Sequence, residues 1–246
     1  MIDISIIIAT YNSSKTLRKA LESVRSQTFQ NWECIIVDGA SKDNTIDIVK
    51  EFEDKDARFR HISEPDNGIY DAFNKGWKMA RGTWIYYLGS DDKIIYDSFE
   101  RMKEYLNVDT AVLTGNVLAE HIDGKIKRVV SKGFDGCHQG KLTKKNVLSE
   151  YNGFNEKYKI LADYDFYVRI QKDCNVTNTM VDIAYFNIGG ASQNLQNFLY
   201  RYNEYFYIRK KNELNCSLYE RTKYILHKLG SIFYRKCSFL IYKYVK

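Results

Sequence analysis

Short apolar runs alternate with amphipathic segments along the first part of the chain, and this alternation strongly limits the folds open to it. The runs are rich in β-branched residues, which is typical of buried strands, and the segments between them place apolar residues at helical spacing. The predicted strands are Ile4 to Ala9, Trp32 to Val37, Arg58 to Ser63 and Thr83 to Leu88. The predicted helices are Ser14 to Gln27, Asn44 to Phe52 and Tyr70 to Ala80. This order predicts an α/β fold with a mostly parallel central sheet flanked by helices.

The pattern is less regular after residue 92. We expect helices at Asp97 to Leu106, Lys144 to Glu150 and Asp163 to Lys172. We expect strands at Thr110 to Ala119, Lys125 to Val130 and Val176 to Ile183, with a hairpin turn at Asp123-Gly124. The chain is therefore predicted to form one domain over residues 1–190, followed by a basic, tyrosine-rich helical extension over residues 191–246.

Carboxylates follow several of the apolar runs. Asp38 ends CIIVD, Asp91 and Asp92 end WIYYLGSDD, and Asp163 lies in ILADYDFYVRI. Ligands of open α/β sheets bind outside the carboxyl ends of the strands, so these acids are predicted to face one site. Two adjacent carboxylates repel each other unless a cation lies beside them, and a hard divalent ion with a diphosphate supplies one. The alternative is a solvated loop that caps the next helix.

The end of the first predicted strand is a second candidate binding element. Thr10, Tyr11 and Asn12 lie between this strand and a helix whose N-terminus favours anions, although helix capping explains the same residues. Neither GxxxxGK[ST] nor GxGxxG occurs, so a nucleotide would be held in another way. Asp38 can accept hydrogen bonds from a base or ribose, and Asp38-Gly39 is equally compatible with a turn.

Five motifs in order resemble the inverting, GT-A type glycosyltransferases of family 2. They are IIATYN, IVDGASKD, EPDNGIYDAFNKG, SDD and ADYDF, and the resemblance covers residues 3 to 190. The most similar branch contains bacterial enzymes of polysaccharide and lipopolysaccharide assembly. The resemblance implies a Rossmann-like central sheet and transfer of a hexose or N-acetylhexosamine from a nucleotide-diphosphate sugar, with a UDP-sugar favoured, to a glycan or lipid-linked acceptor.

The resemblance also implies roles for single residues. Those assigned to the nucleotide sugar are Thr10, Tyr11, Asn12, Asp38, Asn67, Asn74, Asp91 and His138. Asp92, with Asp91, is assigned to Mn²⁺ or Mg²⁺, and Asp163 to the general base. Asp165 lies near the start of the same predicted helix, and the family register favours Asp163. His138 lies in a His-Gln-Gly segment, and a purely structural histidine is the alternative.

Two departures from the family pattern leave rival interpretations open. Gly89 stands where most relatives carry Asp or Asn, and the segment Asp71 to Asn74 lacks the arginine of many relatives. A non-catalytic nucleotide-sugar-binding or membrane-binding module of the same fold is therefore the main rival. A nucleotidyltransferase would need a glycine-rich, basic loop after the first strand, which Ser13-Ser14-Lys15 does not provide.

The basic character of the chain belongs to its last residues. The formal net charge is +6, and residues 197–246 hold 11 Lys/Arg against 3 Asp/Glu. The segment Tyr219 to Tyr244 mixes apolar and basic residues, which predicts a basic amphipathic helix at an anionic bilayer. A helix packed on the catalytic domain is the alternative. No nucleic-acid-binding motif accompanies the basic residues.

Cysteine usage and hydropathy bear on location. The five cysteines are odd in number and form no CxxC pair, so neither a disulfide framework nor a zinc site is expected. The first apolar run has no basic leader, and no run is long enough to span a bilayer. We therefore expect a cytoplasmic protein that binds peripherally to the inner face of the cytoplasmic membrane.

Overall fold

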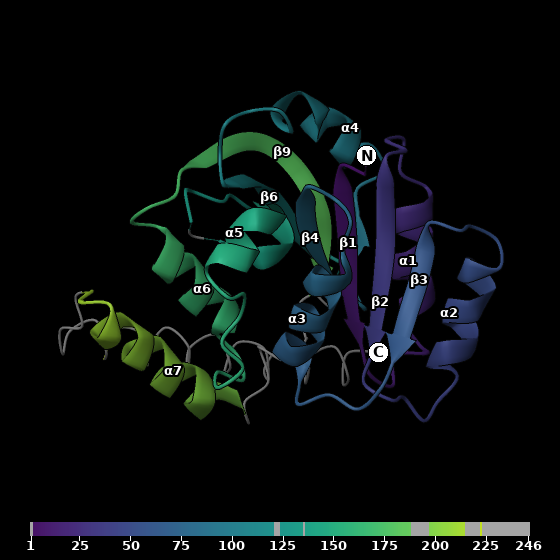
Figure 1. Cartoon of the computed structure of the whole chain (residues 1–246), viewed down its shortest axis with the longest axis horizontal. Coiled ribbons are helices and arrows are strands. Elements are labelled where there is room, and N and C mark those ends of the chain that lie inside the picture. The colour runs from purple at the N-terminus through teal and green to yellow at the C-terminus, as the bar shows by residue number, and fades with distance from the viewer. Residues whose placement is uncertain (1, 121–123, 135, 188–196, 215–221, 223–246) are drawn as a thin grey trace. The chain divides into compact units, whose positions relative to one another are not determined.

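The computed structural model describes residues 2–120, 124–134, 136–187, 197–214 and 222. The chain divides into two compact units, Met1–Gly190 and Ala191–Lys246. In the described residues, the first unit is built on one nine-stranded sheet, ordered β3-β2-β1-β4-β8-β6-β9-β5, with β7 paired to β6 (Figure 1). Helices pack on this sheet, so the predicted α/β class is confirmed.

The first half of the sheet is parallel. It contains β1 (Ile4–Thr10), β2 (Trp32–Asp38), β3 (Phe59–Ser63) and β4 (Trp84–Gly89). The connecting helices are α1 (Leu17–Arg25), α2 (Thr45–Glu53) and α3 (Ile69–Met79). Every strand and helix predicted for this half is present, with small differences at the ends.

Strand alternation divides the core between the two faces of this parallel half. On β1, Ile4, Ile6 and Ile8 are fully buried in one cluster with apolar residues of α1 and α2. The side chain of Ile7 points to the other face, where it lies so close to Gly76 of α3 that a Cβ there would overlap it. Figure 1 shows α1 and α3 on different sides of β1 and β2. Each buried isoleucine contributes about 1.5 to 3 kcal/mol.

The second half of the sheet is mixed. β8 (Lys141–Lys144) runs antiparallel between β4 and β6 (Val112–Glu120), and β9 (Val176–Asn187) runs parallel to β6. β5 (Lys93–Ile94) pairs antiparallel with β9, and β7 (Ile126–Val129) pairs antiparallel with β6, as the predicted hairpin requires. The remaining helices of this unit are α4 (Ser98–Met102), α5 (Lys145–Glu150), α6 (Ala162–Ile170) and the 3₁₀ turns η1 (Lys103–Tyr105) and η2 (His138–Gly140).

The sequence prediction is incomplete in this half. The helix expected over residues 97–106 is a short α-helix followed by a 3₁₀ turn. β5, β8 and η2 are not predicted, and β9 extends to Asn187, beyond the expected end at Ile183. All of these differences lie in segments that are short or that pair with partners distant in sequence.

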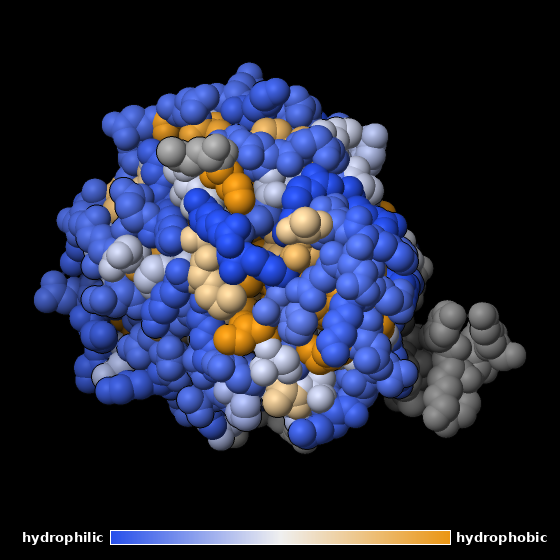
Figure 2. All heavy atoms as spheres, turned by 45° about the vertical axis from the view of Figure 1, so that its right-hand side comes forward, coloured by the Kyte–Doolittle hydropathy of each residue, from blue (hydrophilic) through white to orange (hydrophobic). Residues whose placement is uncertain are grey.

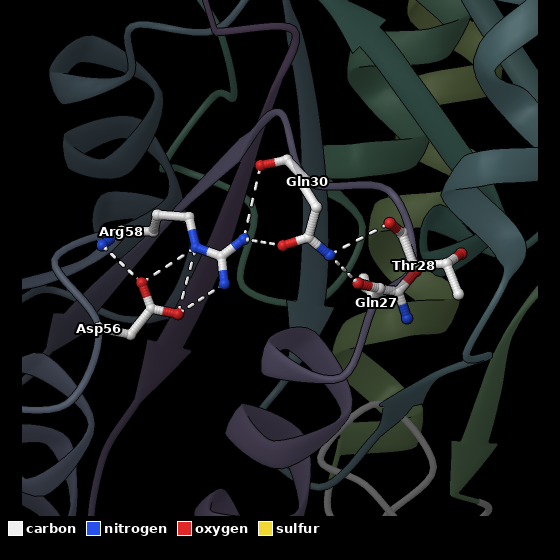
Figure 3. A network of polar contacts seen from close by, with 5 residues as sticks. All are labelled: Gln27, Thr28, Gln30, Asp56 and Arg58. Carbon is white, nitrogen blue, oxygen red and sulfur yellow. Dashed lines mark hydrogen bonds and ion pairs between the residues drawn. The ribbon is translucent and has the colours of Figure 1, made fainter.

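A polar network holds the loops at the amino edge of the parallel strands. Arg58 donates to both carboxylate oxygens of Asp56 and to Gln30 Oε1, and the Gln30 amide donates to the backbone oxygens of Gln27 and Thr28 (Figure 3). The Arg58 guanidinium carbon also lies 3.8 Å from the centroid of the Trp32 ring. The network lies at the edge of the sheet opposite the strand ends that carry the candidate site.

The second unit contains α7 (Phe198–Lys211), and the amphipathic helix expected over 219–244 falls almost wholly outside the described residues. No helix in the described part of the chain is long and apolar enough to cross a membrane.

Figure 2 shows a face on which hydrophilic residues predominate, with apolar residues in small separate patches.

Candidate active site

Strand register aligns the ends of the parallel strands. Thr10 pairs with Asp38, Asp38 with Ser63, and Ala9 with Gly89, so β1, β2, β3 and β4 finish at one level. The loops that follow β1, β2 and β4 therefore meet at the carboxyl edge of the sheet, as the sequence predicts for an α/β fold.

Hydrogen bonds lock the first two of these loops together. The Asn12 backbone N–H donates to Ser41 Oγ at 2.8 Å, and the Lys42 N–H donates to Asn12 Oδ1 at 2.8 Å. Ser13 Oγ lies 3.1 Å from Ser90 Oγ, which ties in the loop after β4. Asn12 has a φ of 49°, a left-handed conformation that asparagine tolerates better than most residues.

Asp38 holds the loop after β2 and the end of β3 together at this edge of the sheet. Its side chain is fully buried and accepts hydrogen bonds from Ser41 N (2.9 Å), Ser41 Oγ (2.5 Å) and Ser63 Oγ (2.7 Å). A carboxylate offers about four lone-pair directions, so one remains on Asp38 Oδ1. Asp38 therefore lies beneath the loop in this structure, and its contact with a nucleobase stays a prediction.

Thr10 and Tyr11 differ in exposure. Thr10 Oγ1 is buried and forms no hydrogen bond within the described residues, whereas the Tyr11 side chain is 62% exposed. A buried hydroxyl without a partner costs about 1 to 3 kcal/mol. A ligand that hydrogen-bonds Thr10 Oγ1 would remove that cost.

The two asparagines of the EPDNGIYDAFNKG motif have different surroundings. Asn74 uses both donors and both acceptor positions of its amide inside the protein, bonding Phe154 N and O, Glu156 Oε1 and Trp77 Nε1. No donor or lone pair of Asn74 is left for a ligand, so the structure places it as a support of the 153–156 loop. Asn67 is exposed and bonds Asp71 Oδ2 through its backbone N–H.

Asp91 and Asp92 lie just after β4, separated from it by Ser90. Asp92 is 2% exposed, and its Oδ1 and Oδ2 accept hydrogen bonds from Asn187 N (2.9 Å) and Gln139 Nε2 (2.8 Å). Burial, followed by the neighbouring charge of Asp91, raises the pKa of Asp92 from 3.8 to about 6. Burial also raises the pKa of Asp91. No ion pair links either acid to Lys, Arg or His within the described residues, although the charge of His138 acts to lower the pKa of Asp92.

Gly89 makes room for Asp92. A Cβ at this position would overlap Asp92 Oδ2 and lie 3.1 Å from Asp91 Oδ1. An Asp or Asn at this position would therefore displace the Asp92 carboxylate from its present position. The present position of the Asp92 carboxylate therefore requires a residue without a side chain at position 89.

Asp91 and Asp92 fit the needs of a hard divalent cation. Burial raises the pKa of both carboxyls, so a bound cation would favour their ionised forms, and Mg²⁺-like ions are commonly held by one or two carboxylates plus substrate phosphates. In the part of the chain that the structure describes, no three His, Cys, Asp or Glu side chains gather to hold a metal. Oxygens of a bound diphosphate would therefore have to complete the coordination.

Asp163 lies in the first turn of α6, and its pKa is shifted in the opposite direction from those of Asp91 and Asp92. Tyr70 Oη lies 2.9 Å from Asp163 Oδ1 and 2.7 Å from the Ile160 carbonyl oxygen. His138 Nδ1 lies 3.3 Å from Asp163 Oδ2. Burial acts to raise the pKa of Asp163, but the His138 hydrogen bond and charge and the Tyr70 hydrogen bond outweigh it, and the pKa is lowered. The Asp163 side chain is 22% exposed.

Asp165 is differently placed. It is fully buried and accepts from Arg169 Nε at 2.8 Å, one turn along α6. Arg169 in turn donates to the carbonyl oxygens of Tyr151 and Gly153. Asp165 thus anchors the loop before α6, and of the two acids only Asp163 is accessible to an acceptor.

The turn η2 contacts both the buried Asp92 and the partly exposed Asp163. His138 contacts Asp163, and its neighbour Gln139 contacts Asp92. The sequence singles out His138 but not Gln139, Tyr70 or Asn187, because the contacts of these three join residues 47, 93 and 95 positions apart. The His-Gln-Gly segment was the one available signal.

Solved structures share this fold. A structure of S. aureus TarS in complex with UDP-GlcNAc aligns with a TM-score of 0.69 and 17% identity, covering 89% of this chain and 69% of that one. A mannosyltransferase, PcManGT from Pyrobaculum calidifontis in complex with GDP-Man and Mn²⁺, aligns with a TM-score of 0.66 and 15% identity, covering 92% and 68%. Both are glycosyltransferase structures of the GT-A type, so the predicted fold type is confirmed.

Sequence comparison gives the family. A PGL/p-HBAD biosynthesis glycosyltransferase of Mycobacterium tuberculosis is 31% identical over 204 residues, which cover 78% of this chain and 79% of that protein. The family model described as glycosyl transferase family 2 matches residues 5–172, which include the strand ends, the paired acids, η2 and Asp163. The chain therefore belongs to glycosyltransferase family 2.

Proposed function

We propose that this glycosyltransferase transfers a sugar, with inversion, from a UDP-sugar to a glycan or lipid-linked acceptor. Asp163 acts as general base, and Asp91 and Asp92 hold Mn²⁺ or Mg²⁺ at the donor diphosphate. The observation that carries the proposal is the pairing of the buried Asp92 after β4 with the partly exposed Asp163 on α6, both contacted by η2. TarS with UDP-GlcNAc and PcManGT with GDP-Man and Mn²⁺ support a nucleotide-sugar donor and a metal.

The chemistry assigned to Asp163 is removal of a proton from the attacking acceptor hydroxyl. A lowered pKa keeps this carboxylate ionised at neutral pH, so it is ready to accept the proton. Tyr70 and His138 orient it from both oxygens. The acceptor oxygen then bonds the anomeric carbon while the bond to the nucleoside diphosphate breaks on the opposite face, which inverts the configuration in one step.

The leaving group is assigned to the other end of the site. A bound divalent cation would neutralise the negative charge that grows on the departing diphosphate. Asp92 is suited to hold it because its carboxylate is fixed by Gln139 and Asn187 and forms no ion pair with a basic side chain in the described residues. Tyr11, Asn12 and Thr10 are proposed to line the nucleoside side, where the loops after β1 and β2 interlock.

The acceptor and the membrane are further parts of the proposal. The name of the mycobacterial relative refers to PGL/p-HBAD biosynthesis, which supports an acceptor in glycolipid or glycan assembly. The basic residues after 197 support attachment to an anionic membrane surface. Sedimentation with anionic and neutral vesicles tests this: the full chain should sediment with anionic vesicles, and a chain ending at Gly190 should not.

The proposed donor is tested by calorimetric titration of the purified chain with UDP, GDP and dTDP, each with Mn²⁺ and again with EDTA. We expect UDP to bind in Mn²⁺ and to bind more weakly in EDTA. Preferred binding of GDP or dTDP would revise the nucleoside only. Failure of all three to bind would favour the non-catalytic module.

A further inference from the structure

The turn η2 places two consecutive side chains on the two acids of the site. We propose that Gln139 is a positioning residue that holds the Asp92 carboxylate in the orientation needed for metal binding. The inference rests on the proposed function, because it assigns a task to Gln139 only if Asp92 is a metal ligand. Nothing in the family resemblance assigns a role to Gln139.

The Gln139 amide is held in one orientation. Its Nε2 donates to Asp92 Oδ2 at 2.8 Å, and its Oε1 accepts a hydrogen bond from the Cys137 thiol. Exchanging the amide oxygen and nitrogen would point the oxygen at a carboxylate and break both contacts. Gln139 is 4% exposed, so water does not offer an easy substitute for either bond.

The backbone of η2 is equally constrained. Tyr86 Oη donates to the Gln139 carbonyl oxygen at 2.9 Å, and the buried Lys141 Nζ donates to the Gly136 carbonyl oxygen at 2.7 Å. A Cβ on Gly140 would come within 2.7 Å of the Gly115 carbonyl oxygen, so the turn packs directly against β6. A side chain carried on such a turn is well suited to fix its partner.

The Asp92 carboxylate depends on this contact for its orientation. Its two oxygens are held by one donor each, Asn187 N from the end of β9 and Gln139 Nε2 from η2. Removing the second donor leaves the carboxylate free to rotate about its remaining bond. Loss of a hydrogen-bonding partner behind a metal ligand typically weakens metal binding about 10- to 100-fold.

The same turn also reaches Asp163 through His138. Gln139 and His138 therefore fix, from adjacent positions, the acid assigned to the leaving-group side and the acid assigned to the acceptor side. A change at Gln139 is expected to act mainly on Asp92, because His138 keeps its own contact with Asp163.

The test replaces Gln139 by methionine, which has a similar size and no donor. The matched control is Gln27→Met, because Gln27 is also buried, at 1% exposed, and also donates through Nε2, to the Ser23 and Ile95 carbonyl oxygens. UDP affinity is measured by calorimetry in Mn²⁺ and in EDTA, and the melting temperature of each variant is recorded.

We expect Gln139→Met to weaken UDP binding in Mn²⁺ about 10-fold while its affinity in EDTA stays at the wild-type level. Gln27→Met should leave both affinities unchanged, whatever it does to the melting temperature. Equal Mn²⁺ dependence in the wild type and Gln139→Met would overturn the positioning role and leave the proposed function standing. A wild type without any Mn²⁺-dependent UDP binding would overturn the metal assignment and this role together.

Discussion

The end of β4 and the start of α6 each carry a carboxylate into the candidate site, but their surroundings are opposite. Asp92 is buried beside a second acid, and its pKa is raised to about 6. Asp163 is partly exposed and contacted by Tyr70 and His138, and its pKa is lowered. Both carboxylates have two hydrogen-bond contacts, but burial dominates at Asp92, whereas the His138 and Tyr70 contacts outweigh burial at Asp163. This difference supports the proposed cation site at the first and the proposed base at the second.

The largest expected effect comes from Asp163→Asn. Removal of a general base typically slows turnover about 100- to 10,000-fold, and the amide keeps the shape of the side chain. UDP release from a UDP-sugar in the presence of acceptor measures turnover, and calorimetry should find UDP affinity unchanged.

The matched control for that variant is Asp165→Asn, on the same helix. It removes the ion pair with Arg169, so it should lower the melting temperature and leave turnover of the folded protein nearly intact. If Asp165→Asn abolished turnover and Asp163→Asn did not, the base assignment would be reversed.

The next expected effect is on the free energy of unfolding, and it has opposite signs for Asp92→Asn and Asp163→Asn. A carboxyl whose pKa rises on folding destabilises the fold above that pKa, and the penalty disappears below its ordinary value near 3.8. Asp92→Asn in EDTA should therefore stabilise the protein at pH 7.5 by up to about 3 kcal/mol, and the gain should fade between pH 6 and 4.

Asp163 should behave in the opposite way. Its lowered pKa contributes stability above the ordinary carboxyl pKa, and this contribution is lost as the pH falls through the folded-state value. Asp163→Asn should therefore destabilise at pH 7.5 by about 1 kcal/mol. Urea unfolding of both variants across this pH range measures the change in the free energy of unfolding. If Asp92→Asn and Asp163→Asn changed this free energy in the same direction, the proposed difference between the two acids would be contradicted.

Gly89→Ala probes the space around Asp92. The new Cβ would overlap Asp92 Oδ2, and the carboxylate would have to leave Gln139 to make room. Affinity for UDP in Mn²⁺ should fall about 10-fold, with no change in EDTA. Gly124→Ala is the control, because nothing lies within 4 Å of a Cβ there, although its φ of +78° adds local strain. An unaffected Gly89→Ala would show that the present pose of Asp92 is not required.

The smallest effect is expected from Tyr70→Phe. This variant removes the hydroxyl 2.9 Å from Asp163 Oδ1 and leaves the ring in place. The pKa of Asp163 should rise, so the acid limb of the pH profile of kcat/KM should move to higher pH. The stability loss should be about 1 kcal/mol. If the acid limb did not move, the Tyr70 hydroxyl would not influence the pKa of the general base.

The sequence predicts the parallel half of the fold well because its strands are short, apolar and separated by clear helical periods. It does not predict β8, whose sequence KLTK begins with a lysine that is 1% exposed. That burial depends on the Gly136 carbonyl oxygen and on the Tyr167 ring, which lies 4.6 Å from Lys141 Nζ. Such partners are set by tertiary contacts that spacing along the chain does not reveal.

The candidate site, like the fold, can be predicted from the sequence only in part. Strand-end acids follow from local pattern, and the structure brings Asp92 and Asp163 to one turn, η2. Asn74 has the right motif position, yet its amide is fully used by Phe154, Glu156 and Trp77. The contacts of Gln139 and Tyr70 join distant segments, so only the folded chain identifies them.

The most direct test of the division between the two acids is calorimetric titration of UDP into Asp92→Ala and Asp163→Asn, side by side with the wild type, in Mn²⁺ and in EDTA. We predict that Asp92→Ala binds UDP in Mn²⁺ no better than in EDTA, and that Asp163→Asn keeps the full Mn²⁺ dependence of the wild type. Full Mn²⁺ dependence in Asp92→Ala, or its loss in Asp163→Asn, would contradict the account.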